Sequence, residues 1–145
     1  MPYDPVMIQP FRDELTRIGI RELRSAVEVD KVLSEKKGTV LVVVNSVCGC
    51  AAGRARPGIT KALQHPNKPE ILTSVFAGQD MEATARAREW FGQIPPSSPS
   101  VALFKDGELV HFIPRFRIEN RDADAIAADL TSAFDEHCAA VKVNA

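Results

Sequence analysis

Residues 39–53 read TVLVVVNSVCGCAAG, a mostly β-branched apolar run followed at once by two cysteines one residue apart. The run at 39–45 predicts a strand buried on both faces, as in a parallel sheet. Residues 51–64 predict a helix with a kink at Pro57, because proline has no amide to bond the carbonyl of Gly53. The two cysteines therefore lie where a buried strand ends and a helix begins.

The rest of the chain alternates predicted helices with predicted strands. Asp4-Pro5 fits the start of a first helix, and Ser25 with Glu28 fits a capping box. Asp106-Gly107 is typical of a tight hairpin turn. The predicted elements are a helix at 4–18, a strand at 20–23, a helix at 25–37, the strand at 39–45, the helix at 51–64, a strand at 71–77, a helix at 81–91, strands at 101–104 and 109–113, and a helix at 122–137.

Strands that alternate with helices imply a parallel core with right-handed crossovers, and the final hairpin adds an antiparallel strand. We therefore predict an α/β fold with a central mixed sheet flanked by helices. The order, with a cysteine pair after the second strand, resembles a thioredoxin-like fold with an extra N-terminal helix. A chain of 145 residues fits one domain. We assign residues 1–145 to a single thioredoxin-like domain, with residues 1–19 as its helical extension.

Composition and charge exclude several classes of function. A formal net charge of −1 argues against a broad electrostatic grip on nucleic acid. The apolar runs are far shorter than the roughly 18 residues that span a membrane, and the N-terminus lacks the pattern of a signal peptide. We therefore expect no membrane partner and a cytoplasmic location, where structural disulfides are rare. Three cysteines there indicate catalysis, metal binding or simple burial.

The position of Cys48 and Cys50 at a helix start favours redox chemistry. Free amides and the helix dipole stabilise an anion there, so a thiolate has a depressed pKa and is the reactive species. We expect Cys48 to attack a substrate disulfide and Cys50 to resolve the product or to tune Cys48. Gly49 permits the tight ring of a disulfide between them, which would be strained and easily reduced. Arg54 and Arg56 could add positive charge, but the sequence does not give their direction.

Two other interpretations of the cysteine pair remain. The pair could be two inert buried thiols, or it could belong to a metal-binding or metal-delivery module. A zinc site of the Cys₃His type could be made from Cys48, Cys50, His137 and Cys138. However, a spacing of one residue between the first two cysteines is unusual for zinc ligands, and His137 and Cys138 lie about 90 residues further along the chain. We therefore expect no metal and keep metal binding as the alternative function.

The loop at residues 94–100, IPPSSPS, supplies a second group of candidate site residues. An average X-Pro bond is cis only about 5% of the time. In thioredoxin-like folds, however, a cis-proline at this point faces the active cysteine, and this resemblance predicts a cis bond at Pro99. Backbone groups of Ser98 would then be free to pair with a bound thiol or peptide, so Ser98 and Pro99 are the predicted substrate-binding residues.

Four strings closely resemble the bacilliredoxin family of small bacterial thioredoxin-like proteins. They are VVVNSVCGCAAGRARPG at 42–58, VFAGQD at 75–80, PPSSPSVALFKDGELVHFIPR at 95–115 and AFDEHC at 133–138. The resemblance covers almost the whole chain. The CGC context and the SSPS loop are its most specific parts.

The resemblance implies a thiol-disulfide oxidoreductase that removes bacillithiol from protein mixed disulfides or isomerises disulfides. Cys48 would attack the mixed disulfide, the client protein would leave, and a second bacillithiol or Cys50 would release the bacillithiol held on Cys48. No bound cofactor is expected. Bacillithiol or a similar low-molecular-weight thiol would be the co-substrate, and the partners would be bacillithiolated or disulfide-containing client proteins.

Three further positions carry simpler predictions. The basic stretch Arg115-Phe116-Arg117 is too short for nucleic-acid binding and is expected in a solvated loop, with a place near the site, where it would attract an anionic thiol, as the alternative. Asp80 is expected to cap the helix that begins at Met81. Cys138 is expected to be an unreactive thiol at a helix end, because burial usually explains a lone cysteine.

Overall fold

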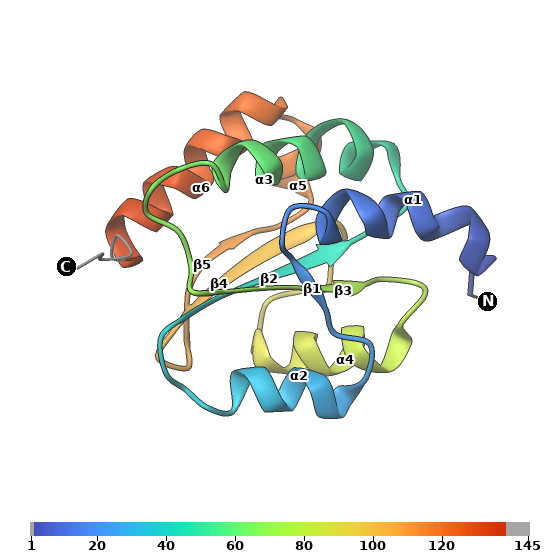
Figure 1. Cartoon of the computed structure of the whole chain (residues 1–145), viewed down its shortest axis with the longest axis horizontal. Helices are drawn as coiled ribbons and strands as arrows, with labels where there is room; N and C mark the ends of the chain where they lie inside the picture. The colour runs from blue at the N-terminus through green and yellow to red at the C-terminus, as the bar shows by residue number, and fades with distance from the viewer. Residues whose placement is uncertain (1, 139–145) are drawn as a thin grey trace.

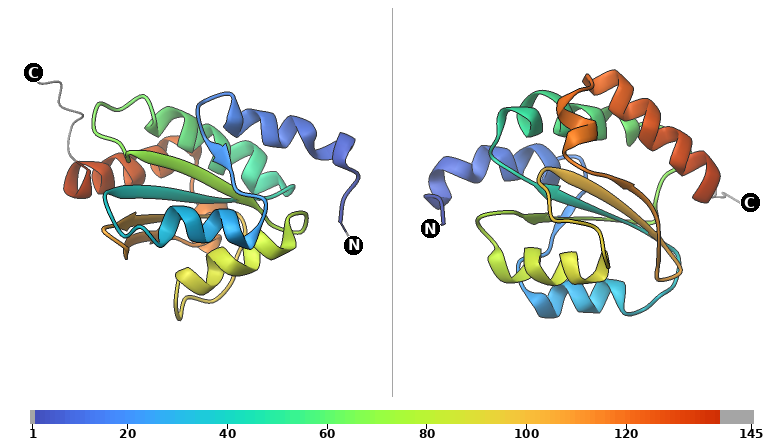
Figure 2. Two further views of the ribbon diagram at one scale, coloured as in Figure 1. Left: turned by 60° about the horizontal axis from the view of Figure 1, so that its bottom comes forward. Right: turned by 180° about the vertical axis from the view of Figure 1, so that it is seen from behind.

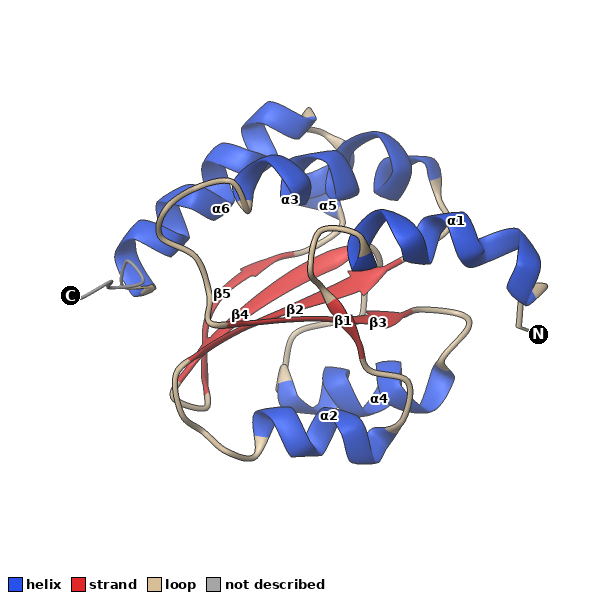
Figure 3. Ribbon diagram, viewed as in Figure 1, coloured by secondary structure: helices blue, strands red, loops and turns tan. Residues whose placement is uncertain are grey.

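A five-stranded sheet with the order β1-β3-β2-β4-β5 forms the middle layer of the protein, as the ribbons in Figures 1 and 3 show. The computed structural model describes residues 2–138. β2 is parallel to β3, and β3 is parallel to β1, whereas β4 is antiparallel to both β2 and β5. The strands are β1 (Arg21–Glu22), β2 (Thr39–Asn45), β3 (Ile71–Phe76), β4 (Ser100–Lys105) and β5 (Glu108–Ile113).

Helices cover both faces of this sheet, and the three views in Figures 1 and 2 agree on their arrangement. One face carries α1 (Pro5–Thr16), the π-helical turn η1 (Ala51–Ala55), α3 (Arg56–Ala62), α5 (Phe116–Glu119) and α6 (Ala123–His137). The other carries α2 (Ala26–Leu33) and α4 (Met81–Trp90). The predicted mixed sheet with flanking helices and an N-terminal helix is therefore present.

The predicted burial of β2 on both faces is confirmed, since all seven of its residues are buried. Leu41 and Val43 pack into the cluster beneath α3 and α6, while Val40, Val42 and Val44 pack into the cluster above α2 and α4. Val44 pairs with Ser100 across the antiparallel ladder. The end of β2, which leads to Cys48, therefore lies at the same sheet edge as the start of β4, which follows Pro99.

Three predicted helix starts and the hairpin turn are confirmed. Asp4 accepts a hydrogen bond from the Val6 amide (2.9 Å). Ser25 accepts one from the Glu28 amide (3.2 Å), and Glu28 reaches back to the Arg24 amide (2.6 Å). Asp122 caps α6. Asp106 and Gly107 both have positive φ (51° and 86°), as a tight hairpin turn requires.

Two predictions are wrong. Asp80 precedes α4 but makes no side-chain cap, because its carboxylate pairs with the buried Arg12 at 2.9 Å. The segment after Arg115 is not a loop but the four-residue helix α5, which buries Ile118. No helix among residues 2–138 is both long and apolar enough to cross a membrane.

The irregularity predicted at Pro57 takes the form of the π-helical turn η1. The amide of Arg56 bonds the carbonyl of Ala51, five residues earlier. A π turn inserts one extra residue into the helix and so changes which side chains face inward, and such turns are frequent at functional sites. Here the turn brings Ala55 and Arg56 to the buried side of the helix.

Gly58 marks the closest approach of α3 to α6. A Cβ atom at this position would lie 2.9 Å from Ile126 Cγ2 and 3.0 Å from the carbonyl oxygen of Ala123. We expect Gly58→Ala to lower the free energy of unfolding by about 1–3 kcal/mol, because overpacking outweighs the better helix propensity of alanine. Urea denaturation measures this change.

Gly53→Ala is the matched control, since Gly53 has no atom within 4 Å of its Cβ position. It should leave the free energy of unfolding unchanged or raise it slightly. Equal stability of the two variants would contradict the close packing of α3 on α6.

Candidate active site

Cys48 and Cys50 lie at the amino end of η1, directly after the buried strand β2. Their sulfurs are 2.9 Å apart, within hydrogen-bonding distance, and both residues are free thiols. Cys50 is only 8% exposed and packs into the core, whereas Cys48 is half-buried. Cys48, the predicted nucleophile, is therefore the more exposed residue of the pair.

The surroundings of Cys48 favour its thiolate. Burial raises its pKa, but hydrogen bonds from the Cys50 thiol and the Ala51 amide, together with those from the Ser46 hydroxyl and the Cys50 amide, outweigh burial and hold the pKa below the ordinary value. The Cys48 amide donates to Ser46 Oγ at 3.3 Å, which fixes the hydroxyl beside the sulfur. Amides and a hydroxyl that point at the sulfur stabilise negative charge.

Cys50 behaves in the opposite way. Burial raises its pKa, and the hydrogen bond to Cys48 and the charge of Cys48 raise it further, while the nearby Arg115 cation lowers it. Two thiols this close share protons, so the pair ionises in two separated steps. The geometry therefore favours the thiolate at Cys48 and the protonated thiol at Cys50.

The Ser98–Pro99 peptide bond is cis, as predicted. Pro99 is buried and immediately precedes β4, so the loop reaches the sheet edge that carries the cysteines. The Ser98 carbonyl accepts a hydrogen bond from Arg115 Nη1 at 3.3 Å. Because a carbonyl oxygen can accept two hydrogen bonds, this contact leaves one acceptor position of Ser98, and its role in substrate binding stays a prediction.

Arg115 lies at the site, which was the alternative to the solvated loop expected for residues 115–117. Its amide donates to Ser97 Oγ (3.2 Å), and its Nε pairs with Glu119 (3.1 Å). The hydrogen bond to Glu119 and, after it, the charges of Cys50 and Cys48 raise the pKa of Arg115. The residue follows β5, which ends at the same sheet edge, so three separate segments of the chain meet there.

Of Arg54 and Arg56, only Arg56 contacts the segment that leads into the cysteine pair. Arg54 is exposed and donates to the carbonyl of Arg121 (2.9 Å). Arg56 is 1% exposed and donates to Asn45 Oδ1 (2.9 Å) and to the Ser46 carbonyl (2.8 Å). It contacts the backbone that leads into the cysteines.

A mostly apolar groove of about 570 Å³ adjoins the cis-proline loop. Phe116, 65% exposed, stands at its wall. A concave apolar surface with a few polar groups is typical of a binding site. The residues that line it are Ile94, Pro95, Pro96, Ser97, Phe112, Pro114, Arg115, Phe116 and Glu119.

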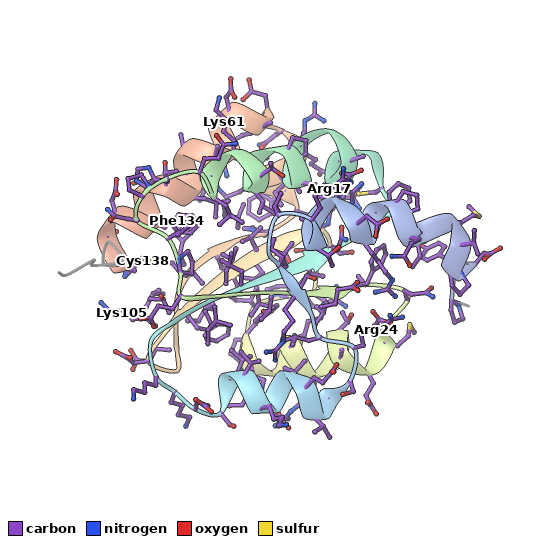
Figure 4. All side chains as sticks on the ribbon, viewed as in Figure 1. Arg17, Arg24, Lys61, Lys105, Phe134 and Cys138 are labelled. Atoms are coloured by element: carbon purple, nitrogen blue, oxygen red, sulfur yellow. The ribbon has the colours of Figure 1, made fainter. Side chains whose placement is uncertain are left out.

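Cys138 lies at the opposite end of the sheet from the pair. Burial raises its pKa, and its neighbours include Thr39 and Lys105, which face each other across the start of β2. Figure 4 shows Cys138 and Lys105 side by side at this end. Between residues 2 and 138, no three His, Cys, Asp or Glu side chains lie close enough to hold a metal ion. The four candidate metal ligands are therefore not brought together.

The opposite pKa shifts give an expected pH dependence of thiol reactivity. Thiolate forms as pH rises through the pKa, so alkylation of Cys48 should reach half its maximal rate at a lower pH than that of a free cysteine measured alongside. Alkylation of Cys50 should reach half its maximal rate at a higher pH than that of the free cysteine. Iodoacetamide labelling from pH 5 to 10, resolved by peptide mass spectrometry, measures both profiles. Identical profiles for Cys48 and Cys50 would contradict the asymmetry.

Comparison with known proteins gives consistent matches over nearly the whole chain. A family model described as "Disulphide isomerase" matches residues 3–138. A bacilliredoxin of Koribacter versatilis is 56% identical over 138 residues, which are 95% of this chain and 95% of that protein. A bacilliredoxin of Geobacillus kaustophilus is 52% identical and covers 95% of this chain and 98% of that protein.

Solved structures match at the level of the fold. The thioredoxin of Fasciola hepatica superposes with a TM-score of 0.54 at 19% identity, covering 81% of this chain and 99% of its own. The oxidised thioredoxin of Plasmodium falciparum superposes with a TM-score of 0.57 at 18% identity. The match covers 83% of this chain and 100% of that thioredoxin. The predicted thioredoxin-like fold is therefore confirmed.

Proposed function

Because the chain belongs to the disulphide isomerase family, with bacilliredoxins among its relatives, we propose that it removes bacillithiol from mixed disulfides on client proteins. The observation that carries the proposal is the asymmetric thiol pair. Cys48 is half-buried with a lowered pKa, and the buried Cys50, with a raised pKa, lies 2.9 Å away. Such a pair suits one attacking thiolate and one resolving thiol.

The reaction proceeds in two exchanges. The Cys48 thiolate attacks the bacillithiol sulfur of the mixed disulfide, the sulfur–sulfur bond to the client breaks, and the client thiolate leaves and takes up a proton. Bacillithiol is then disulfide-bonded to Cys48. A second bacillithiol thiolate can attack the bacillithiol sulfur of this disulfide, which releases bacillithiol disulfide and returns the Cys48 thiolate. Alternatively Cys50, after it loses its proton, attacks the Cys48 sulfur, which expels bacillithiol as a thiolate and leaves a Cys48–Cys50 disulfide for external thiols to reduce.

The surroundings of the thiol pair supply binding groups for both reactants. The cis-proline loop and the apolar groove beside it suit an exposed apolar segment of a client protein. The Arg115 cation, 45% exposed, favours an anionic small thiol near the sulfurs. We therefore assign Ser98 and Pro99, with Arg115, to substrate binding, and bacillithiol to the role of co-substrate rather than bound cofactor.

The test compares three disulfide substrates at equal concentration. One client protein is loaded with bacillithiol, the same client is loaded with glutathione, and a scrambled ribonuclease serves as an isomerase substrate. Intact-mass spectrometry follows release of the small thiol, and ribonuclease activity follows isomerisation. The proposal expects the fastest turnover with the bacillithiolated client. Faster isomerisation than release would replace it with disulfide isomerisation.

A further inference from the structure

Arg56 is among the largest fully buried side chains of the protein, although it is charged. Its Nε donates to Glu14 Oε1 at 2.8 Å, and this single carboxylate is itself 40% exposed. Within the described residues, Nη2 is buried without a hydrogen-bond partner. Burying a cation costs free energy, and an apolar side chain would fill the site at a lower cost. The arginine therefore calls for a reason other than packing.

The remaining bonds of Arg56 lead to the nucleophile. Nη1 donates to Asn45 Oδ1 (2.9 Å) and to the Ser46 carbonyl (2.8 Å). The same Asn45 oxygen accepts the Ser46 amide (2.9 Å), so both backbone polar groups of Ser46 are fixed. The Ser46 hydroxyl then accepts the amide of Cys48 (3.3 Å) and stabilises its thiolate. One guanidinium nitrogen thus holds the two residues that orient Cys48.

The N-terminal helix α1 holds this arginine from the other side. The Phe11 ring lies under the guanidinium, 5.0 Å from its carbon, and the Phe11 carbonyl accepts Asn45 Nδ2 at 3.2 Å. Glu14, one turn later, supplies the ion pair. α1 therefore contacts both Arg56 and Asn45, the two groups that fix the segment before Cys48.

We propose that Arg56 is a positioning residue for Cys48, and that α1 belongs to the active site through Phe11 and Glu14. The inference rests on the proposed function only in taking Cys48 as the nucleophile. Loss of Arg56 frees the Ser46 carbonyl and the Asn45 side chain, so the Ser46 hydroxyl loses its fixed position beside the sulfur. Reactivity of Cys48 then falls at neutral pH, where a stabilised thiolate matters.

The experiment measures iodoacetamide labelling of Cys48 against pH in Arg56→Gln, Arg56→Lys and Ser46→Ala. Arg12→Gln is the matched control. Like Arg56, Arg12 is buried, and its guanidinium lies over an aromatic ring, that of Phe76. It lies on α1 and forms ion pairs with Asp80 and Glu22. The melting temperature of each variant is measured in parallel. Labelling needs no disulfide substrate, so it reports on positioning even if the proposed bacillithiol chemistry fails.

Arg56→Gln should slow labelling at pH 7 by about three- to tenfold, the effect of losing one hydrogen bond, and move the profile to higher pH. Arg56→Lys should restore part of the rate, since an ammonium can bond one of the two acceptors. Ser46→Ala should reproduce the Arg56→Gln profile. Arg12→Gln should lower the melting temperature and leave the profile unchanged.

Two results would overturn the inference. One is an unchanged profile in Arg56→Gln, and the other is an equal shift in Arg12→Gln, which would indicate general loosening. If Arg56→Gln does not fold, the labelling of Cys48 against pH is measured in Ser46→Ala and Glu14→Gln instead. A wild-type pH profile of labelling in both variants would reject the proposal. A normal labelling pattern with no bacillithiol release would instead reject the proposed function alone.

Discussion

Cys48→Ser is expected to abolish release of bacillithiol from a client protein, lowering the rate by about a thousandfold or more. Serine keeps the size of the side chain but replaces a thiolate, stabilised here by two amides, a hydroxyl and the Cys50 thiol, with an un-ionised hydroxyl. Cys50 cannot substitute, because it is 8% exposed and its pKa is raised. Intact-mass spectrometry of the client in single-turnover experiments measures the rate.

Cys138→Ser is the matched control for this loss. Cys138 is also buried, but it lies beside Thr39 at the opposite end of β2. Its variant should release bacillithiol at the wild-type rate. Substantial release by Cys48→Ser, or loss of release in Cys138→Ser, would move the assignment of the nucleophile away from Cys48.

Cys50→Ala is expected to separate the two exchanges. The first exchange needs only Cys48, so one equivalent of client should still be released, and a mixed disulfide of bacillithiol with Cys48 should accumulate in the absence of added thiol. The variant should also label more slowly at pH 7, because removal of the hydrogen bond from Cys50 raises the pKa of Cys48. Mass spectrometry of the enzyme itself, with and without added bacillithiol, detects the trapped species.

The response to added thiol decides the role of Cys50. If Cys50 resolves the mixed disulfide, its variant depends on added bacillithiol for every turnover, while the wild type forms a Cys48–Cys50 disulfide. If Cys50 only tunes Cys48, both proteins accumulate the mixed disulfide to the same extent. Cys50→Ala with wild-type labelling and no trapped species would contradict both roles.

Much of the fold follows from short-range signals in the sequence. The β-branched run at 39–45 is a buried strand. Ser25 and Glu28 start α2, where Ser25 accepts the Glu28 amide and Glu28 accepts the Arg24 amide. Asp106-Gly107 turns the hairpin. Each signal depends on a few neighbouring residues, whose backbone preferences and caps act locally. The cis bond at Pro99 was predicted in another way, through resemblance to a known fold.

The contents of the site behind the cysteines depend on distant parts of the chain. Arg56 points inward because of a π turn and meets Glu14, 42 residues earlier. Asp80 has the position of a cap, but an arginine 68 residues away takes its carboxylate. α5 has four residues, too few to show helical periodicity. Tertiary contacts of this kind leave no local pattern in the sequence.

The short connection between β2 and η1 makes Cys48 activation a property of the folded chain, because the donors around the sulfur take their places only when both elements are formed. The end of β2 fixes the Ser46 hydroxyl, and the first turn of η1 fixes the amides of Cys50 and Ala51 that hydrogen-bond Cys48. An unfolded or newly made chain therefore carries only ordinary thiols, with little nucleophilic power at neutral pH. We therefore expect Cys48 to gain its reactivity only once these two elements have formed.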